Sequence, residues 1–145
     1  MSVLVDANVL LYAKFSDFPQ HEQAHSWLDG ALSKPGPVGI PWVSMAAFIR
    51  IGTNRRILEE PMAPDEACEQ VRQWSERGNV WMPVPGDRFG PLFLELLGTS
   101  QATGNLVSDA YLGALALEHG LSVVSTDTDF GRFLNVKWFN PLDAR

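Results

Sequence analysis

Four aspartates stand where the sequence predicts the end of a strand or the start of a helix, and side chains so placed could do metal-dependent chemistry. Asp6 follows a short apolar segment near the N-terminus, and Asp127 and Asp129 follow a second apolar run late in the chain. Asp109 lies in the first turn of the helix predicted before that run, where free backbone N–H groups stabilise an anion. Because the carboxyl ends of neighbouring parallel strands meet at one edge of a sheet, we expect these acids to converge.

Carboxylates gathered at one sheet edge predict a bound cation. They repel one another, raise one another's pKa values and destabilise the bare protein. Ligands that are all oxygen favour Mg²⁺ or Mn²⁺ over Zn²⁺, and such an ion can activate water and neutralise charge on a phosphoryl group during in-line attack. Taken singly, each acid has an ordinary structural role, Asp6 and Asp127 as caps, Asp109 as a partner of the helix dipole and Asp129 as a solvated loop residue. Their joint placement favours the metal site.

The elements that must position these acids alternate between strands and helices. Apolar residues from Val107 to Leu117 recur at the spacing of a helix with one buried face, and Gly120 is suited to end it. Short apolar runs predict strands at 2–5, 38–40, 79–82, 121–125 and 137–139. The same patterns predict the other helices at 9–13, 20–32, 41–58, 65–77 and 87–97, with Asp87 as the cap of the last. We therefore expect a single α/β domain over residues 1–145, with three α/β/α layers and a mainly parallel central sheet.

Composition limits the classes of function that the chain can perform. With 145 residues, 46% of them apolar, there is ample material for a core. The net charge of −6 excludes a broad basic surface for nucleic acid, so a protein of this charge that handles RNA or DNA needs metal ions or local arginine patches. Cys68 is the only cysteine, which favours a reducing compartment. No signal peptide or membrane-spanning run is evident, and we expect a soluble cytoplasmic protein with no membrane contact.

Sequence motifs along nearly the whole chain together resemble one known family. They comprise Asp6 after the first strand, D-A-Y-L-G-A-L-A-L from Asp109 and S-T-D-T-D-F-G-R-F around Asp127. Two further segments, W-V-S-M-A-A-F-I-R-I-G-T-N-R-R-I from Trp42 and W-F-N-P-L from Trp138, extend the match. In these features the chain resembles the PIN-domain ribonucleases of the VapC toxin family.

The resemblance implies both an activity and its residues. It implies a PIN-like fold and an endoribonuclease that depends on Mg²⁺ or Mn²⁺, with Asp6, Asp109 and Asp127 as metal ligands. Asp129 would complete the catalytic set, either as a further metal ligand or as a residue that contacts the metal ligands. The resemblance also implies a homodimer held inactive by a VapB-type antitoxin whose tail enters the acidic site. Which RNA is cut, and where, does not follow from it.

One position departs from the family pattern. Family members usually carry a glutamate on the helix after the second strand, at about Ala47 in this chain, yet no acidic residue occurs from Gly30 to Leu58. The absence leaves open whether one or two metal ions bind. It also motivates an alternative, a PIN-fold protein with an impaired site that binds RNA or a partner without cutting. Turnover that requires metal would separate the two hypotheses.

Polar residues around the acids have two candidate roles. Arg50, Asn54 and Arg55 could contact RNA phosphates as the local basic patch that the net charge makes necessary, or form a solvated helix face. Ser125 and Asn8 could orient metal ligands or the attacking water, or simply form turns.

Two other motifs suggest chemistry that their context argues against. H-E-Q-A-H from His21 fits the H-E-x-x-H pattern of zinc peptidases, but it lies in the first turn of a short helix, and His119 is the only histidine outside the motif. A calcium loop beginning at Asp127 lacks the required glycine and glutamate. A phospho-acceptor receiver domain would need an aspartate at a central strand that the region from Gly30 to Leu58 does not supply.

Overall fold

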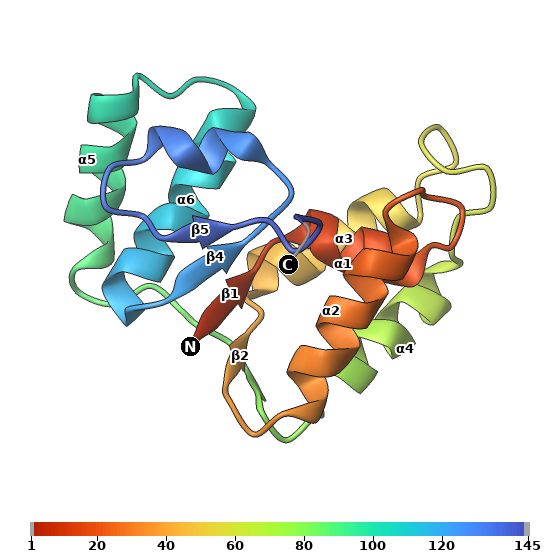
Figure 1. Cartoon of the computed structure of the whole chain (residues 1–145). Helices are drawn as coiled ribbons and strands as arrows, with labels where there is room; N and C mark the ends of the chain where they lie inside the picture. Colours follow the sequence, from red (N-terminus) through yellow and green to blue (C-terminus); the bar gives the residue numbers. More distant parts are fainter. Residues whose placement is uncertain (1, 144–145) are drawn as a thin grey trace.

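A five-stranded parallel sheet with helices on both faces forms the centre of the computed structural model, which describes residues 2–143 (Figure 1). The strand order is β3-β2-β1-β4-β5, and every neighbouring pair is parallel. The strands are β1 (Val3–Val5), β2 (Val38–Gly39), β3 (Val80–Trp81), β4 (Ser122–Val124) and β5 (Trp138–Phe139). This arrangement confirms the predicted three-layer α/β/α fold.

The helices divide between the two faces of the sheet. Four pack on one face, namely α1 (Ala7–Lys14), α2 (His21–Ser33), α3 (Trp42–Gly52) and α4 (Pro64–Ser75). The other face is covered by α5 (Phe89–Ser100) and α6 (Asn105–His119), with a 3₁₀ turn η1 (Thr128–Arg132) after β4. Figure 1 shows the two groups on opposite sides of the strands.

The central strand β1 supplies residues to both apolar cores, because successive side chains of a strand point to opposite faces. Val3 and Val5 belong to the core under α1 to α4, whereas Leu4 belongs to the core under α5 and α6. Phe48 and Phe130 are the largest fully buried side chains and lie in different cores. Burial of each such ring contributes roughly 1.5–3 kcal/mol, so both faces hold the sheet in place.

The register of the sheet brings β1 and β4 to the same edge. Val5 pairs with Val124, and the backbone N–H of Asp6 donates to the carbonyl of Val124 at 3.0 Å. The residues that follow the two strands, Asp6 and Ser125, therefore lie side by side. The acidic loop predicted from the sequence starts at this point.

Two helix boundaries differ from the sequence prediction. The helix α3 ends at Gly52 rather than at Leu58, because the chain turns after Thr53 and the backbone N–H groups of Ile57 and Leu58 both donate to the carbonyl of Asn54. The helix α5 begins at Phe89 without a side-chain cap, so the prediction that Asp87 caps it is wrong.

The helices in the described part of the chain are too short or too polar to cross a lipid bilayer.

Candidate active site

Asp6 is held rigidly at the junction of β1 and α1. One carboxylate oxygen accepts the backbone N–H of Ala7 at 2.7 Å, and the other accepts the hydroxyl of Ser125 at 2.7 Å. The amide of Asn8 donates to the same Ser125 oxygen at 3.1 Å. Ser125 is fully buried, so the contact ties the end of β1 to the end of β4.

Ser125 also organises the acidic loop after β4. Its hydroxyl accepts the backbone N–H of Asp127 at 3.0 Å, and its carbonyl accepts the indole N–H of Trp138 at 2.9 Å. Asp127 in turn accepts the backbone N–H of Asp129 at 2.9 Å and caps η1. This local bonding holds the Asp127 side chain at the sheet edge.

Asp109 approaches the loop from α6, and its place in that helix differs from the prediction. The helix begins at Asn105 after Gly104, whose φ of +57° makes the sharp entry, so Asp109 lies in the second turn rather than the first. It is therefore beyond the free N–H groups of the helix start, and the stabilisation by the helix dipole predicted for it is wrong.

Three carboxyl groups converge at this edge. Ligand oxygens of Asp109, Asp127 and Asp129 all lie within 4.8 Å of one another, and among residues 2–143 this is the one such group of three or more His, Cys, Asp or Glu side chains. Asp6 is not one of the three, but it lines a common cavity with Asp109. All four predicted acids are thus brought to one region by β1, β4 and α6.

The electrostatics of the bare cluster are unfavourable. The pKa of Asp109 is raised to about 8, chiefly by burial, and also by proton sharing with Asp127 and the like charges of Asp127, Asp6 and Asp129. Burial also raises the pKa of Asp6, with the charge of Asp127 acting in the same direction and the Ser125 hydroxyl opposing it. At neutral pH the bare site therefore retains a proton that a cation could replace.

The donor set fits a hard divalent cation. Every candidate ligand is a carboxylate, and Ser125 and Asn8 orient Asp6 from behind as supporting groups do around metal sites. The chain thus has residues suited to a divalent metal at this edge.

A cavity of about 290 Å³ opens beside the acids, between α3 and α6. Asp6 and Asp109 lie on its wall, and so does Ala47, the position of the missing family glutamate. The other residues around it are Ala7, Val43, Ser44, Ala46, Arg50, Ser108 and Leu112. At position 47 the wall of this cavity therefore carries a methyl group and no carboxylate.

Ser44 has a role that the sequence did not reveal. Its buried hydroxyl donates to the carbonyl of Val5 at 2.7 Å and fixes α3 against the strand that carries Asp6. A serine near the start of a helix is normally interpreted as a helix cap. The position of Ser44 in the sequence therefore gave no indication of its bond to Val5.

The predicted RNA-contact residues fall in two different places. Arg50 lines the cavity beside the acids, and within residues 2–143 it forms no ion pair. Asn54 and Arg55 lie beyond the end of α3, where the Asn54 side chain accepts the backbone N–H of Arg56. The structure therefore groups Arg50 with the acids and separates the other two from it.

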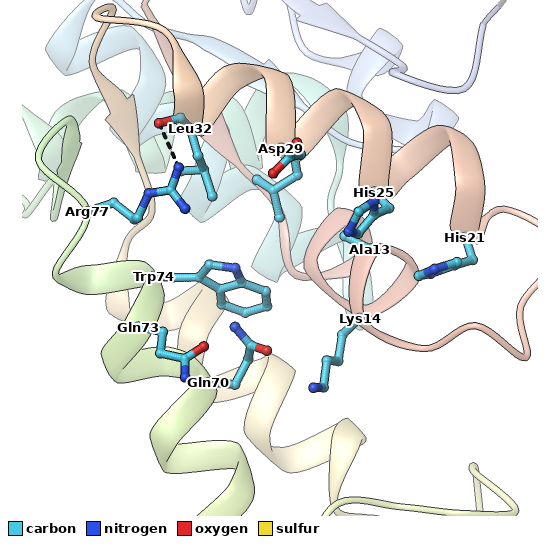
Figure 2. Close-up of a pocket in the computed structure, with 11 residues that line it drawn as sticks. Ala13, Lys14, His21, His25, Asp29, Leu32, Gln70, Gln73, Trp74 and Arg77 are labelled. Carbon is cyan, nitrogen blue, oxygen red and sulfur yellow. Dashed lines mark hydrogen bonds between the residues drawn. The ribbon is translucent and has the colours of Figure 1, made fainter.

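The H-E-x-x-H motif lies at a separate cavity of about 420 Å³ between α2 and α4. Figure 2 shows His21 and His25 on successive turns of α2, with Trp74 of α4 on the other side of the cavity and Arg77 beside Leu32 at the far end of α2. The Nδ1 atom of His21 lies 2.8 Å from the carbonyl of Tyr12. Within residues 2–143 no third His, Cys, Asp or Glu joins the pair in a metal-binding group, so a zinc-peptidase site is not assembled.

Comparison with known proteins gives consistent matches along the chain. A family model described as "PIN domain" matches residues 3–134. Ribonuclease VapC37 of Mycobacterium tuberculosis is 41% identical over 138 residues, which cover 95% of this chain and 96% of the relative. Ribonuclease VapC33 of the same organism is 34% identical over 140 residues, covering 97% and 98%.

Solved structures match the fold at lower identity. VapBC-1 from nontypeable Haemophilus influenzae gives a TM-score of 0.72 at 14% identity and covers 99% of this chain and 100% of its own. Mycobacterium tuberculosis VapC20, described as a Sarcin-Ricin loop cleaving toxin, gives 0.64 at 18% identity and covers 93% and 98%.

Proposed function

The chain belongs to the PIN domain family and, within it, to the VapC ribonucleases, and we propose that it is an endoribonuclease dependent on Mg²⁺ or Mn²⁺ and the toxin of a toxin–antitoxin pair. The observation that carries the proposal is the convergence of Asp6, Asp109, Asp127 and Asp129 at one sheet edge. Raised pKa values of Asp109 and Asp6 support a role for these acids beyond structure.

Each acid has a distinct task in the proposed reaction. Asp6, Asp109 and Asp127 would hold the metal ion, and Ser125 keeps Asp6 in a fixed orientation. When bound, the ion would activate water and neutralise charge on the phosphoryl group. Asp129, whose side chain is half exposed, would accept a hydrogen bond from the incoming water and so orient it.

One observation favours an alternative function. Ala47 places a methyl group beside Asp6 and Asp109 where the family pattern has a carboxylate. A weakened metal site would leave a protein that binds RNA or a partner without cutting.

Cleavage of RNA by the purified chain separates the two functions. With a pool of structured RNAs, we expect cleavage in Mg²⁺ or Mn²⁺, none in chelator, and none from an Asp6→Asn variant in either condition. Asparagine keeps the shape of Asp6 but removes the charge that would bind the ion. A folded, metal-supplied wild-type chain that leaves the pool intact would favour the binding protein, and full activity of Asp6→Asn would refute the assignment of Asp6.

The surface of α5 supports a homodimer. The apolar side chains of Phe89, Leu92, Phe93 and Leu97 pack against the core that contains Leu96, whereas Leu94 is 67% exposed. A second copy of the chain, packed on the same surface, would bury this side chain.

Replacing Leu94 by aspartate tests this contact. We expect the wild-type chain to have twice the monomer mass by light scattering at micromolar concentration, and Leu94→Asp to be a monomer, because a charge in the centre of an apolar interface is not solvated. Val84→Asp, at an exposed apolar position in a loop, is the matched control and should remain dimeric. A monomeric wild-type chain would contradict the proposal.

A protein antitoxin of the VapB type is the proposed partner, in the cytoplasm where the RNA substrates lie. The names of the relatives and the VapBC complexes among similar structures support it. The acidic site adds a physical reason, since a basic side chain inserted among the carboxylates would take the place of the metal ion.

A further inference from the structure

His21 and His25 form a pair of imidazoles on one face of α2, outside the acidic site. They are four residues apart, and both line the cavity of about 420 Å³ between α2 and α4 (Figure 2). Side chains at this spacing lie one above the other on a helix. None of the acids at the sheet edge lines this cavity. The proposed nuclease reaction therefore makes no use of the histidine pair.

The separation of the two rings suits one shared metal ion. Their centroids are 5.4 Å apart, and the ring planes are inclined by 37°. A tetrahedral ion lies about 2.1 Å from each imidazole nitrogen, and each nitrogen lies about 1.1 Å from its ring centre, so two such ligands have their centres about 5.2 Å apart. The observed separation is close to this value, so the two rings need not move apart or together to bind an ion.

The hydrogen bond of His21 determines which of its nitrogens is free. Nδ1 lies 2.8 Å from the backbone carbonyl oxygen of Tyr12 in α1. A carbonyl oxygen can only accept, so Nδ1 carries the proton and donates, and Nε2 of the neutral ring keeps its lone pair. Histidines that bind metals commonly donate their other ring N–H to a backbone carbonyl, which fixes the tautomer and the orientation of the ring. His21 is thus held as a metal ligand would be.

The polar residues around the pair suit a partly hydrated ion. Gln70 and Gln73 line the cavity from α4, and Asp29 lines it from α2. Their oxygens can accept hydrogen bonds from water molecules bound to an ion. Two cationic residues also line the cavity, but Figure 2 shows Arg77 at its far end and the Lys14 side chain pointing away from both rings. The end of the cavity at the histidines is therefore the end suited to a cation.

We infer that His21 and His25 together bind one transition-metal ion of the class of Zn²⁺, Ni²⁺ and Cu²⁺, at a second metal site that is independent of the acids. Imidazole nitrogen suits these ions, whereas Mg²⁺ prefers oxygen ligands. Water occupies the remaining coordination positions. The ion is linked to α1 through His21 and the Tyr12 carbonyl, so its binding stabilises the contact between α1 and α2.

Peptidase chemistry is not part of this inference. Glu22, the residue that would act as the base in an H-E-x-x-H site, is not among the residues around the cavity. The inference also does not rest on the nuclease proposal, because the two sites share no residue.

Titration with Ni²⁺ tests the site without RNA. The parent is the untagged chain with Asp109→Asn and Cys68→Ser in excess Mg²⁺, so that neither the acidic cluster nor the exposed thiol competes for the ion. We expect calorimetry to show one Ni²⁺ bound per chain, and Ni²⁺ to raise Tm. His25→Ala should weaken Ni²⁺ binding by at least ~10-fold, since loss of a group that merely supports a ligand already costs about 10- to 100-fold.

His21→Asn separates metal binding from folding. The amide of asparagine can take the place of Nδ1 and still donate to the Tyr12 carbonyl, but it has no nitrogen at the position of Nε2. This variant should unfold at the same temperature as the parent in chelator, and lose Ni²⁺ affinity as His25→Ala does.

His119→Gln is the matched control, because His119 is the one other histidine and does not line the cavity. Its Nε2 lies 2.7 Å from the carbonyl of Val84, where a glutamine amide can still donate. His119→Gln should bind Ni²⁺ with the affinity of the parent.

Electron paramagnetic resonance of bound Cu²⁺ counts the nitrogen ligands. At less than one ion per chain, the parent should show coupling to two nitrogens and His25→Ala to one. A pair of histidines that only stabilised the fold would not produce this difference.

Several outcomes would overturn the inference. These are a parent that binds no Ni²⁺, equal affinity of His25→Ala and the parent, or a loss of affinity in His119→Gln as large as in His25→Ala. A parent whose Cu²⁺ is coupled to a single nitrogen would also overturn it. So would a mass that doubles when Ni²⁺ is added to the parent but not to His25→Ala, because the ion would then join two chains. Failure of the chain to cut RNA would leave the inference unaffected.

Discussion

An Asp109→Asn variant is expected to lose RNA cleavage by at least ~10²-fold and, in the absence of metal, to unfold at a higher temperature than the wild-type chain. Loss of a group that merely supports a metal ligand already costs about 10- to 100-fold, so loss of a ligand itself should cost more. The gain in stability has a separate cause. Asparagine is neutral, and it removes like-charge repulsion with Asp6, Asp127 and Asp129 at a partly buried position.

The two effects of Asp109→Asn are measured in separate experiments. Cleavage is followed with the RNA and metal that the wild-type chain uses, and thermal unfolding is followed in chelator at pH 8. Glu59→Gln is the matched control, because it removes one negative charge from an exposed position outside the cluster. Undiminished cleavage would refute the role of Asp109, and a lower unfolding temperature would show that its carboxylate stabilises the bare fold.

The convergence of the acids was predictable because it depends on few properties of the chain. Asp6 and Asp127 each follow an apolar strand, and parallel strands that are neighbours must end at the same edge. The sequence gives no strand order directly, but β1 and β4 pair in the structure as that argument required. The roles of these acids in metal binding and cleavage are still predictions.

Helix boundaries were harder to predict, because apolar spacing continues past the last helical residue. Ile57 and Leu58 extend the pattern of α3, yet their backbone N–H groups both donate to the carbonyl of Asn54 in a turn. The start of α6 was misjudged for a related reason. Gly104 adopts a positive φ, which is seen in the structure but cannot be predicted from the sequence. The helix therefore begins one turn before Asp109.

The cavity beside the acids could not be predicted from the sequence. Trp42 and Phe48 are both large apolar residues of α3, but one is exposed and the other fully buried. Which of them lacks a neighbour depends on how α3 lies against β1 and α6, and the Ser44 bond to Val5 sets part of that arrangement. Periodicity identifies an apolar face but not the gap beside it.

In the absence of divalent metal, the free energy of unfolding is expected to decrease as pH rises from about 4 to 8. The pKa of Asp109 is about 8 in the folded chain and 3.8 for an unperturbed carboxyl group. Between these values the folded state binds a proton that the unfolded state does not, so the free energy of unfolding decreases with rising pH. Glu118, whose pKa is lowered by backbone N–H groups of the loop at Gly86, affects stability only at pH values near or below 4.5.

Metal should counteract this loss of stability. A divalent ion binds the ionised acids and displaces the proton, so its affinity should increase with pH up to about 8. At a hundredfold excess over Kd the ion adds about 2.7 kcal/mol to the free energy of unfolding. For a chain of this size that corresponds to roughly 8 °C in Tm. The measurement is thermal unfolding from pH 5 to 8 in chelator and in Mn²⁺.

Asp109→Asn identifies the group responsible for both effects. Without the titrating carboxyl, the decline in stability with pH in chelator should be smaller, and Mn²⁺ should raise Tm by less than in the wild-type chain. A wild-type chain that is more stable at pH 8 than at pH 5 in chelator, or a variant with the full response to Mn²⁺, would contradict the assignment. Because neither readout requires RNA, the result tests the metal site even if the substrate is absent from the RNA pool.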